Sequence, residues 1–390
     1  MSVTKVVEGS YAIAMAVKQC RPKVISAYPI TPQTHIVEYL AKMVSDGELD
    51  AKYVWADSEF AAASIVLGAS AVGVRSYTAS SSQGLLLMTE VLWNMAGMRL
   101  PVVVTAANRA VSAPITIEVD HQDTMSFRDC GILQIYVEES QEAYETHFAA
   151  YKVAENKEVL LPAVVCVDGW ILTHAYEPVT FYDQEIIDDF LPEYDPPFRL
   201  TPDNPIVLGS WADESVIMES RYEMFEAQRK AEELFERYSS DLAEITGNDF
   251  GGVLEEYRTE DAEICFVAMG SICGTIKRGV DKLRKNGKRA GLIRIRLYRP
   301  FPGNKLREIV EKYEIEKVVV IDRSYSIGSG SCLSLDLKSS LYDMNHHPVV
   351  VTCFAGIGGK MISASDVEDL FNYAKNLKER SKTYWLNLYK

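Results

Sequence analysis

A threonine lies between two prolines directly after an apolar run. Pro29, Thr31 and Pro32 follow the run Val24–Ala27. Each proline fixes its own φ and disfavours helix at the residue before it, so the Thr31 hydroxyl should be held in one place. Ligand sites in open α/β sheets lie off the carboxyl ends of strands, which makes Thr31 a candidate site residue. The segment is equally compatible with a rigid turn in which the threonine caps a helix.

A glutamate at the start of an apolar helix is the second candidate. Ser58 could cap this helix and place Glu59 in its first turn, where the helix dipole favours a carboxylate. The residues from Phe60 to Leu67 are nearly all apolar, so the helix start should be buried in an interface. A buried carboxylate needs a partner, which favours a functional role for Glu59.

An arginine follows another predicted strand. Arg109 lies just past Val102–Ala106, where its planar guanidinium could bind a carboxylate or phosphate. A structural ion pair with Asp120 or Asp123 is the alternative, and position alone does not separate the two.

Other polar or glycine-rich segments carry weaker signals. His121 lies alone in a polar loop, so it is more often a hydrogen-bonded spacer than an acid/base group, and no second histidine has metal-ligand spacing. The segments 326–331 and 356–359 are rich in glycine but match neither nucleotide-binding pattern. Tight turns explain them as well.

Composition limits the class of protein. The 390 residues carry a formal net charge of -15, which argues against binding nucleic acid or an anionic membrane. Neither a membrane-spanning apolar stretch nor a signal peptide is evident, so we expect a cytoplasmic protein. The seven cysteines are scattered without C-x-x-C spacing, which indicates small core residues rather than disulfides, zinc or iron–sulfur ligands.

Strands alternate with helices along most of the chain. This pattern predicts an α/β fold with parallel sheets covered on both faces. A proline-rich connector is expected over 178–210 and a charged helix over Glu214–Ser239. The predicted strands are Val24–Ala27, Tyr53–Ala56, Arg75–Thr78, Pro101–Ala106, Leu133–Val137, Leu160–Val167, Ile264–Met269, Gly291–Leu297, Val318–Asp322 and Val349–Phe354.

Several motifs together resemble the α subunits of pyruvate:ferredoxin oxidoreductases, in the 2-oxoacid:ferredoxin oxidoreductase family. The resemblance covers nearly the whole chain and is specific in combination and order. It is carried by Tyr28–Pro32, Asp57–Glu59, Ala107–Pro114, Asp120–Met125, Tyr257–Glu263, Tyr298–Pro302 and Phe354–Gly359.

The resemblance implies a domain organisation and a set of roles. A pyrimidine-binding domain for thiamine diphosphate would occupy 1–210, a linker helix region 211–256, and a smaller transketolase C-terminal-like domain 257–390. Glu59 would hydrogen-bond N1′ of the aminopyrimidine, Thr31 would lie near the substrate, and Arg109 would pair with its carboxylate. The residues expected against the cofactor are Glu59, Tyr28, Pro29 and Ser82.

The resemblance also implies a multi-subunit enzyme. It would catalyse CoA-dependent oxidative decarboxylation of pyruvate, or the reverse, with electrons passed to ferredoxin in anaerobic metabolism. Thiamine diphosphate would be shared with a β subunit. Mg²⁺ and [4Fe–4S] clusters would lie on the β, γ or δ partners, with no metal on this chain, which would be inert alone.

One loop departs from the family pattern. Glu118 and Val119 lie in Thr116–Asp120, where the family commonly has another sequence near the substrate. A different oxoacid (2-oxoisovalerate, 2-oxoglutarate or an aryl-pyruvate) is therefore an alternative. A non-catalytic scaffold subunit is another. An NAD enzyme is disfavoured because no glycine fingerprint follows the first strand.

Overall fold

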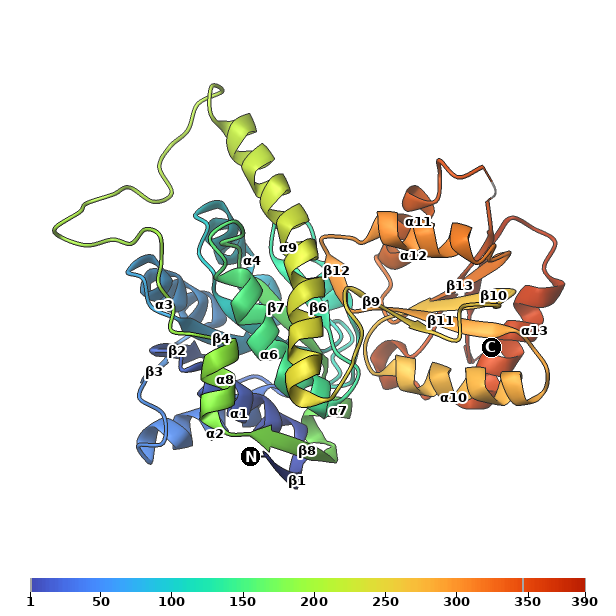
Figure 1. Cartoon of the computed structure of the whole chain (residues 1–390), viewed down its shortest axis with the longest axis horizontal. Coiled ribbons are helices and arrows are strands. Elements are labelled where there is room, and N and C mark those ends of the chain that lie inside the picture. Colours follow the sequence, from blue (N-terminus) through green and yellow to red (C-terminus); the bar gives the residue numbers. More distant parts are fainter. Residues whose placement is uncertain (1, 346, 390) are drawn as a thin grey trace.

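The chain forms two α/β units that lie side by side, each around its own sheet (Figure 1). A computed structural model describes residues 2–345 and 347–389. The strand order is β12-β6-β7-β5-β4-β2-β3 in the first sheet and β15-β14-β13-β10-β11-β9 in the second, and β1 pairs with β8 in a separate ribbon. The predicted α/β class is confirmed.

The first sheet is parallel apart from its edge strand β12. Its central strands β4, β5 and β7 are buried along their whole length, as expected for apolar strands covered on both faces. The strands from the first unit are β2 (Val24–Ala27), β3 (Lys52–Trp55), β4 (Ser76–Ser80), β5 (Val103–Asn108), β6 (Leu133–Tyr136) and β7 (Ala163–Asp168).

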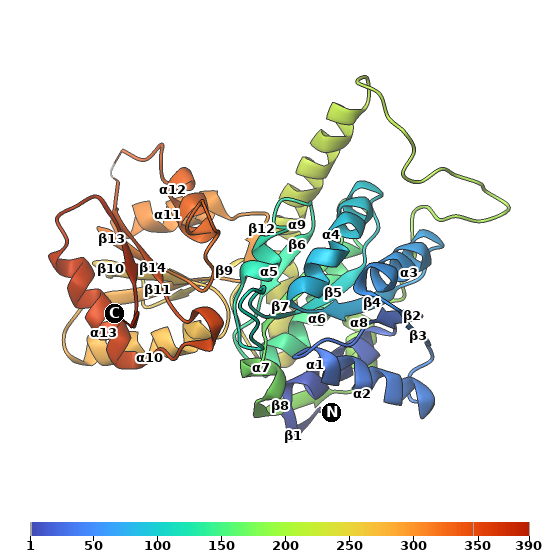
Figure 2. The same ribbon diagram turned by 180° about the vertical axis from the view of Figure 1, so that it is seen from behind.

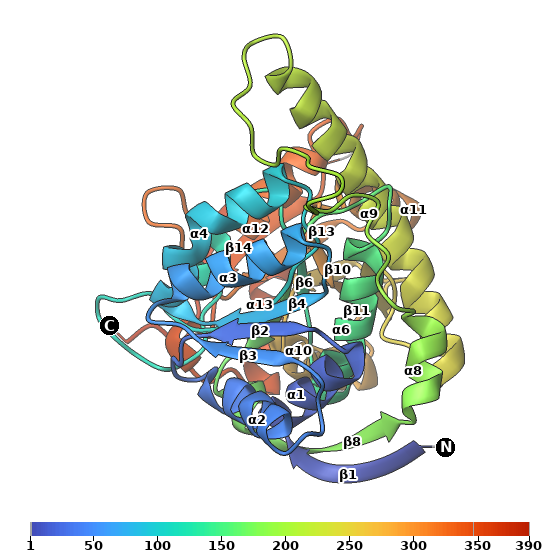
Figure 3. The ribbon, with the colours of Figure 1, turned by 90° about the vertical axis from the view of Figure 1, so that its left-hand side faces the viewer.

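Helices cover both faces of this sheet. Figure 3 shows α1 and α2 on one side of β2 and β3, and α3 and α4 on the other. The helices α1, α2 and α6 contribute to one apolar core, and α3 and α4 to another. Their bounds, with two short helices, are α1 (Gly9–Cys20), α2 (Thr34–Ser45), α3 (Glu59–Ala71), α4 (Ser82–Gly97), α5 (Gln122–Met125), α6 (Ser140–Ala154) and α7 (Ile171–His174).

The second unit repeats this design on a smaller scale. Its strands run parallel except β9, and α10 and α13 pack on one face while α11 and α12 pack on the other. The elements are β9 (Leu254–Tyr257), β10 (Ile264–Ala268), α10 (Ile272–Lys285), β11 (Ala290–Ile295), α11 (Gly303–Lys312), β13 (Lys317–Asp322), α12 (Cys332–Ser340), β14 (Val349–Phe354), a 3₁₀ turn (Ile357–Gly359), α13 (Ala364–Asn376) and β15 (Ser381–Trp385).

The two units share a core. The strand β12 (Leu297–Arg299) leaves the second unit and pairs antiparallel with β6 of the first sheet. One apolar cluster continues from α3 and α4 into α11 and α12. Beside it, the buried Glu142 carboxylate pairs with Arg294 at 2.6 Å and with Arg296 at 2.5 Å. These contacts fix the second unit against the first.

The prediction of an extended connector over 178–210 is wrong for the first part of this range. β8 (Tyr176–Tyr182) and α8 (Gln184–Phe190) occupy it, because Val179, Phe181 and Phe190 face the core. The remainder is irregular and mostly exposed, and it projects from the body with the start of α9 (Ile217–Thr246), as Figures 1 and 2 show. The ribbon strand β1 (Ser2–Glu8) and α1 were not predicted.

Two further sequence expectations concern the whole chain. All seven cysteines are free and buried, so their interpretation as core residues is confirmed. Within residues 2–345 and 347–389, no helix combines the length and apolar character needed to cross a bilayer.

Candidate active site

The carboxyl ends of β2 and β5 bring two predicted site residues together. Arg109 follows β5, and its Nη1 donates a hydrogen bond of 2.7 Å to the carbonyl oxygen of Thr31. The strand β4 lies between β2 and β5 in the sheet, so the turn that begins α4 lies between Thr31 and Arg109. The side chain of Gln83 in this turn lies 3.5 Å from Arg109 Nη2.

The Arg109 guanidinium is buried without a carboxylate partner in the described part of the chain. Its Nε has no hydrogen-bond partner there, and burial lowers its pKa. The ion pair considered from sequence is not found, since Asp123 Oδ2 accepts from the backbone N–H of Arg109 at 2.9 Å instead. A planar, charged donor set is therefore available to an incoming anion.

Asp123 holds the backbone of this site in place. Its Oδ2 also accepts from the N–H of Ser82 at 3.0 Å, while Oδ1 accepts from Asn108 Nδ2 at 2.8 Å and from the N–H of Thr124 at 2.8 Å. Burial raises the pKa of Asp123 to about 6. Asp123 thus joins the end of β5 to the start of α4, a positioning role that sequence reasoning missed.

Glu59 is the first residue of α3. Ser58 caps the helix as predicted, because its Oγ accepts from the N–H of Ala61 at 3.1 Å. Glu59 is only 7% exposed, and no residue in 2–345 or 347–389 forms a hydrogen bond or ion pair with its carboxylate. A buried carboxylate of this kind is costly unless another group completes it.

Three residues near Glu59 form a small cluster with it. We call this group the cradle; its members are Glu59, Ser80, Ser81 and Gly84. A Cβ added to Gly84 would lie 2.5 Å from Glu59 Oε1 and would also overlap Ser80 Oγ, so only glycine lets these two side chains pack this closely against α4. The hydroxyls of Ser80 and Ser81 are buried with no partner among the described residues. The cradle therefore presents three unsatisfied polar groups.

The other residues predicted to contact the cofactor are Ser82, Tyr28 and Pro29. Ser82 is buried, and its hydroxyl donates to the carbonyl oxygen of Ala110 at 2.7 Å, so it is engaged within the chain. Tyr28 and Pro29 lie on the exposed side of the proline turn. Sequence reasoning chose Ser82, whereas Ser80 and Ser81 have the free hydroxyls, because a sequence does not show which hydroxyl is already bonded.

His121 connects the two units. Its Nε2 lies 2.7 Å from Asp168 Oδ1, and Asp168 Oδ2 accepts from the N–H of Ser271 at 2.9 Å and pairs with Arg323. Burial alone would raise the pKa of Asp168. The charges of Arg323 and His121 outweigh this effect and hold the pKa well below its usual range. His121 is therefore hydrogen-bonded within the chain, as its interpretation as a spacer predicts.

The loop that departs from the family pattern faces the second unit. Val119 is fully buried, and its carbonyl oxygen accepts from the N–H of Gly359 at 3.1 Å. The Glu118 carboxylate packs against the same glycine, which has a φ of 75°. The glycine-rich segments form tight turns, as predicted, with φ of 92° at both Gly328 and Gly330.

Two family models match this chain. Residues 15–240 match "Pyruvate flavodoxin/ferredoxin oxidoreductase, thiamine diP-bdg", and residues 262–367 match "Pyruvate:ferredoxin oxidoreductase core domain II". The chain belongs to the pyruvate:ferredoxin oxidoreductase family. The resemblance stated from sequence is confirmed.

Named relatives match over almost their full length. The chain is 45% identical over 386 residues to "Pyruvate synthase subunit PorA" of Methanothermobacter thermautotrophicus, covering 99% of this chain and 98% of that protein. It is 39% identical over 381 residues to "Ketoisovalerate oxidoreductase subunit VorA" of Pyrococcus horikoshii, covering 97% and 95%.

Solved structures share the fold. A 2-oxoglutarate:ferredoxin oxidoreductase from Magnetococcus marinus with 2-oxoglutarate, coenzyme A and succinyl-CoA bound matches with a TM-score of 0.74 at 19% identity. The match covers 95% of this chain and 65% of that larger chain. A split-gene transketolase, an inactive β4 tetramer, matches with a TM-score of 0.57 at 14% identity, covering 96% and 100%. The predicted fold class, including its transketolase likeness, is confirmed.

Proposed function

We propose that this chain is the α subunit of a pyruvate synthase and supplies the pyrimidine-binding half of a thiamine diphosphate site. The complex catalyses CoA-dependent oxidative decarboxylation of pyruvate to acetyl-CoA and CO₂ with electrons passed to ferredoxin, or the reverse. The relatives named pyruvate synthase subunit PorA are more similar to this chain than those named VorA, which favours pyruvate over 2-oxoisovalerate.

The cradle around Glu59 is the observation that carries this proposal. Its buried carboxylate and the unpartnered hydroxyls of Ser80 and Ser81 suit a polar heterocycle, and Gly84 lets the Glu59 carboxylate pack against the start of α4. When bound, thiamine diphosphate supplies a nucleophilic carbon and takes up the electron pair left by departing CO₂. Glu59 holds or accepts a proton at the ring nitrogen that it contacts.

Arg109 and Thr31 serve the substrate. The guanidinium of Arg109 binds the oxoacid carboxylate, because it is buried, charged and without a carboxylate partner in the described chain. Its bond to the Thr31 carbonyl oxygen fixes its direction. The proline-flanked Thr31 hydroxyl then lies beside the bound oxoacid, and this orientation lowers the barrier by reducing the entropy lost in the reaction.

An exposed apolar surface around the cradle suits a partner chain. Trp55, Phe60 and Leu87 are between 40% and 54% exposed, and they lie on β3, α3 and the first half of α4. Large exposed apolar side chains that cluster mark interaction surfaces. We assign this surface to the β subunit, which would hold the rest of the cofactor.

The remaining members of the complex are predictions from the family resemblance. Mg²⁺ and the [4Fe–4S] clusters belong to partner subunits, γ and δ chains complete the assembly, and CoA and ferredoxin are its co-substrates. The cytoplasmic location expected from sequence also stays a prediction.

The variant Glu59→Gln tests the proposal in the assembled complex. Replacing the carboxylate by an amide of the same shape should reduce pyruvate-dependent ferredoxin reduction at least ~100-fold, since proton handling at the cofactor is lost. The matched control is Glu38→Gln, an exposed glutamate on α2. Activity of Glu59→Gln within about threefold of the control would favour the scaffold alternative and overturn the proposal.

A further inference from the structure

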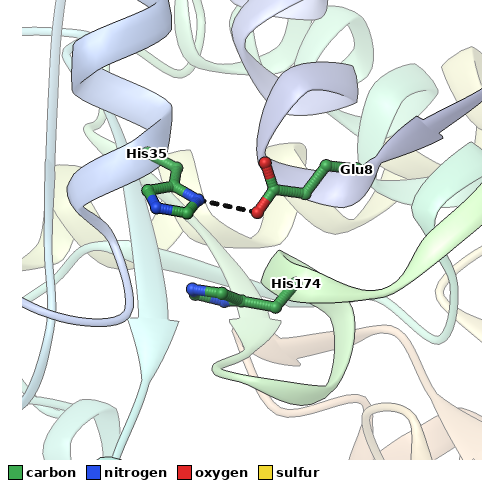
Figure 4. Close-up of side chains that lie close together, drawn as sticks. All are labelled: Glu8, His35 and His174. Carbon is green, nitrogen blue, oxygen red and sulfur yellow. Dashed lines mark hydrogen bonds and ion pairs between the residues drawn. The ribbon is translucent and has the colours of Figure 1, made fainter.

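Three possible metal ligands lie close together away from the cradle. Glu8 ends β1, His35 lies in the first turn of α2, and His174 ends α7. Figure 4 shows the two imidazole rings and the carboxylate facing one another. One ligand atom from each residue lies within 4.8 Å of the others. Segments that are remote in sequence thus bring two histidines and a glutamate to one point.

The Glu8 carboxylate is almost buried, and its hydrogen-bond partners are a histidine ring and a tyrosine hydroxyl. Its side chain is 6% exposed, Oε1 lies 2.7 Å from His35 Nδ1, and Oε2 accepts from the Tyr39 hydroxyl at 2.9 Å. No lysine or arginine in the described chain pairs with it. A buried carboxylate without a permanent cation favours the binding of one.

His174 is held in an orientation that suits a ligand. Its ring stacks on Trp170 with centroids 4.4 Å apart, and its Nδ1 lies 2.8 Å from Thr173 Oγ1. These contacts fix the ring and leave Nε2 for a metal.

We propose that Glu8, His35 and His174 form a binding site for a divalent transition-metal ion of the zinc type, with a fourth position open to water. Two imidazoles and one carboxylate are a donor set that Zn²⁺ accepts, whereas Mg²⁺ and Ca²⁺ prefer oxygen ligands alone. With bonds of about 2.0–2.1 Å, tetrahedral ligand atoms lie ~3.3 Å apart. The His35 side chain is 45% exposed and is free to make the small adjustment that this requires.

The site would join three segments, two of which border the proline turn. A Cβ added to Gly169, just before α7, would lie 2.7 Å from Pro32 Cγ, so the segment that leads to His174 packs on the turn that carries Thr31. Metal binding would tie this segment and the start of α2 to the ribbon strand β1. We therefore expect binding to raise the thermal unfolding midpoint of the chain.

Titration with Zn²⁺ tests the proposal on the full chain, prepared without an affinity tag and freed of metal by a chelator. Calorimetry should give one equivalent of Zn²⁺ per chain, and Co²⁺ in its place should give the visible absorption of a tetrahedral site. Glu8→Gln and His174→Ala should each weaken the binding of Zn²⁺ at least ~100-fold, because each removes a ligand. The matched control is His347→Ala, which changes a histidine on a loop of the second unit and should bind like the parent chain.

Binding of Zn²⁺ that is equally tight in the parent chain and in both ligand variants would overturn the proposal, as would the absence of a stoichiometric site. Circular dichroism checks that each variant is folded. If a variant does not fold, anomalous scattering at the zinc edge from crystals of the parent chain decides. A peak between the three side chains supports the site, and its absence from that position refutes it.

Discussion

Replacing Gly84 by alanine should displace the Glu59 carboxylate without unfolding the chain. The added Cβ would lie 2.5 Å from Glu59 Oε1 and would also overlap Ser80 Oγ. Ordinary van der Waals contact needs about 3.5–4.0 Å, so the carboxylate must retreat by ~1 Å. A misplacement of 1 Å in an active site can cost ~100-fold in rate, so we expect a loss of that order in Gly84→Ala.

The stability of the chain should respond differently. Gly84 lies in α4, where alanine favours helix over glycine by about 1 kcal/mol, which offsets part of the steric cost. Gly68→Ala is the matched control, because Gly68 lies within α3 and an added Cβ would meet nothing within 4 Å. The control should retain activity.

The assay is pyruvate-dependent ferredoxin reduction by the assembled complex, together with the dissociation constant of thiamine diphosphate. Gly84→Ala should lose activity and bind the cofactor more weakly, while its unfolding midpoint stays near that of Gly68→Ala. Equal activity and equal cofactor affinity in the two variants would refute the assignment of the cradle to the cofactor.

Arg109→Ala should raise the KM for pyruvate about 10- to 100-fold, because a charged hydrogen bond contributes ~1.5–3 kcal/mol. The KM for CoA should stay within about twofold of the parent value. Equal changes in the two KM values would contradict the role of Arg109 in binding the oxoacid carboxylate. Burial alone would raise the pKa of Glu142, but Arg294 and Arg296 lower it to about 2, below the usual range of a glutamate. This carboxylate therefore stabilises the fold by about 3 kcal/mol above pH ~4.5, and the contribution is lost as the pH falls towards 2. Glu142→Gln should lower the free energy of unfolding in urea by that amount at pH 7 and flatten its pH dependence in this window, whereas an unchanged profile would show that the pair contributes nothing.

Local patterns predicted much of the first unit. The apolar run Val24–Ala27 is β2, and the cap at Ser58 places Glu59 at the start of α3 as expected. These predictions succeed because strand ends, prolines and caps are properties of a few neighbouring residues. The strands β10, β11, β13 and β14 of the second unit were predicted for the same reason, whereas β9 and β15 were not predicted.

Features that depend on distant residues could not be predicted. β12 leaves its own unit to pair with β6, and nothing in its three residues specifies that partner. Asp123 binds the backbone N–H of Arg109 rather than its guanidinium, which only the folded loop decides. Glu8, His35 and His174 have no ligand spacing along the chain, since the ribbon and two helices bring them together. Sequence reasoning therefore expected no metal on this chain.

The most direct test of the central claim is an experimental structure of the assembled complex with thiamine diphosphate bound. We expect the Glu59 carboxylate to lie within hydrogen-bond distance of an aminopyrimidine nitrogen, with a partner chain over α3 and α4. A cofactor bound elsewhere, with the Glu59 carboxylate facing only protein or water, would contradict this claim.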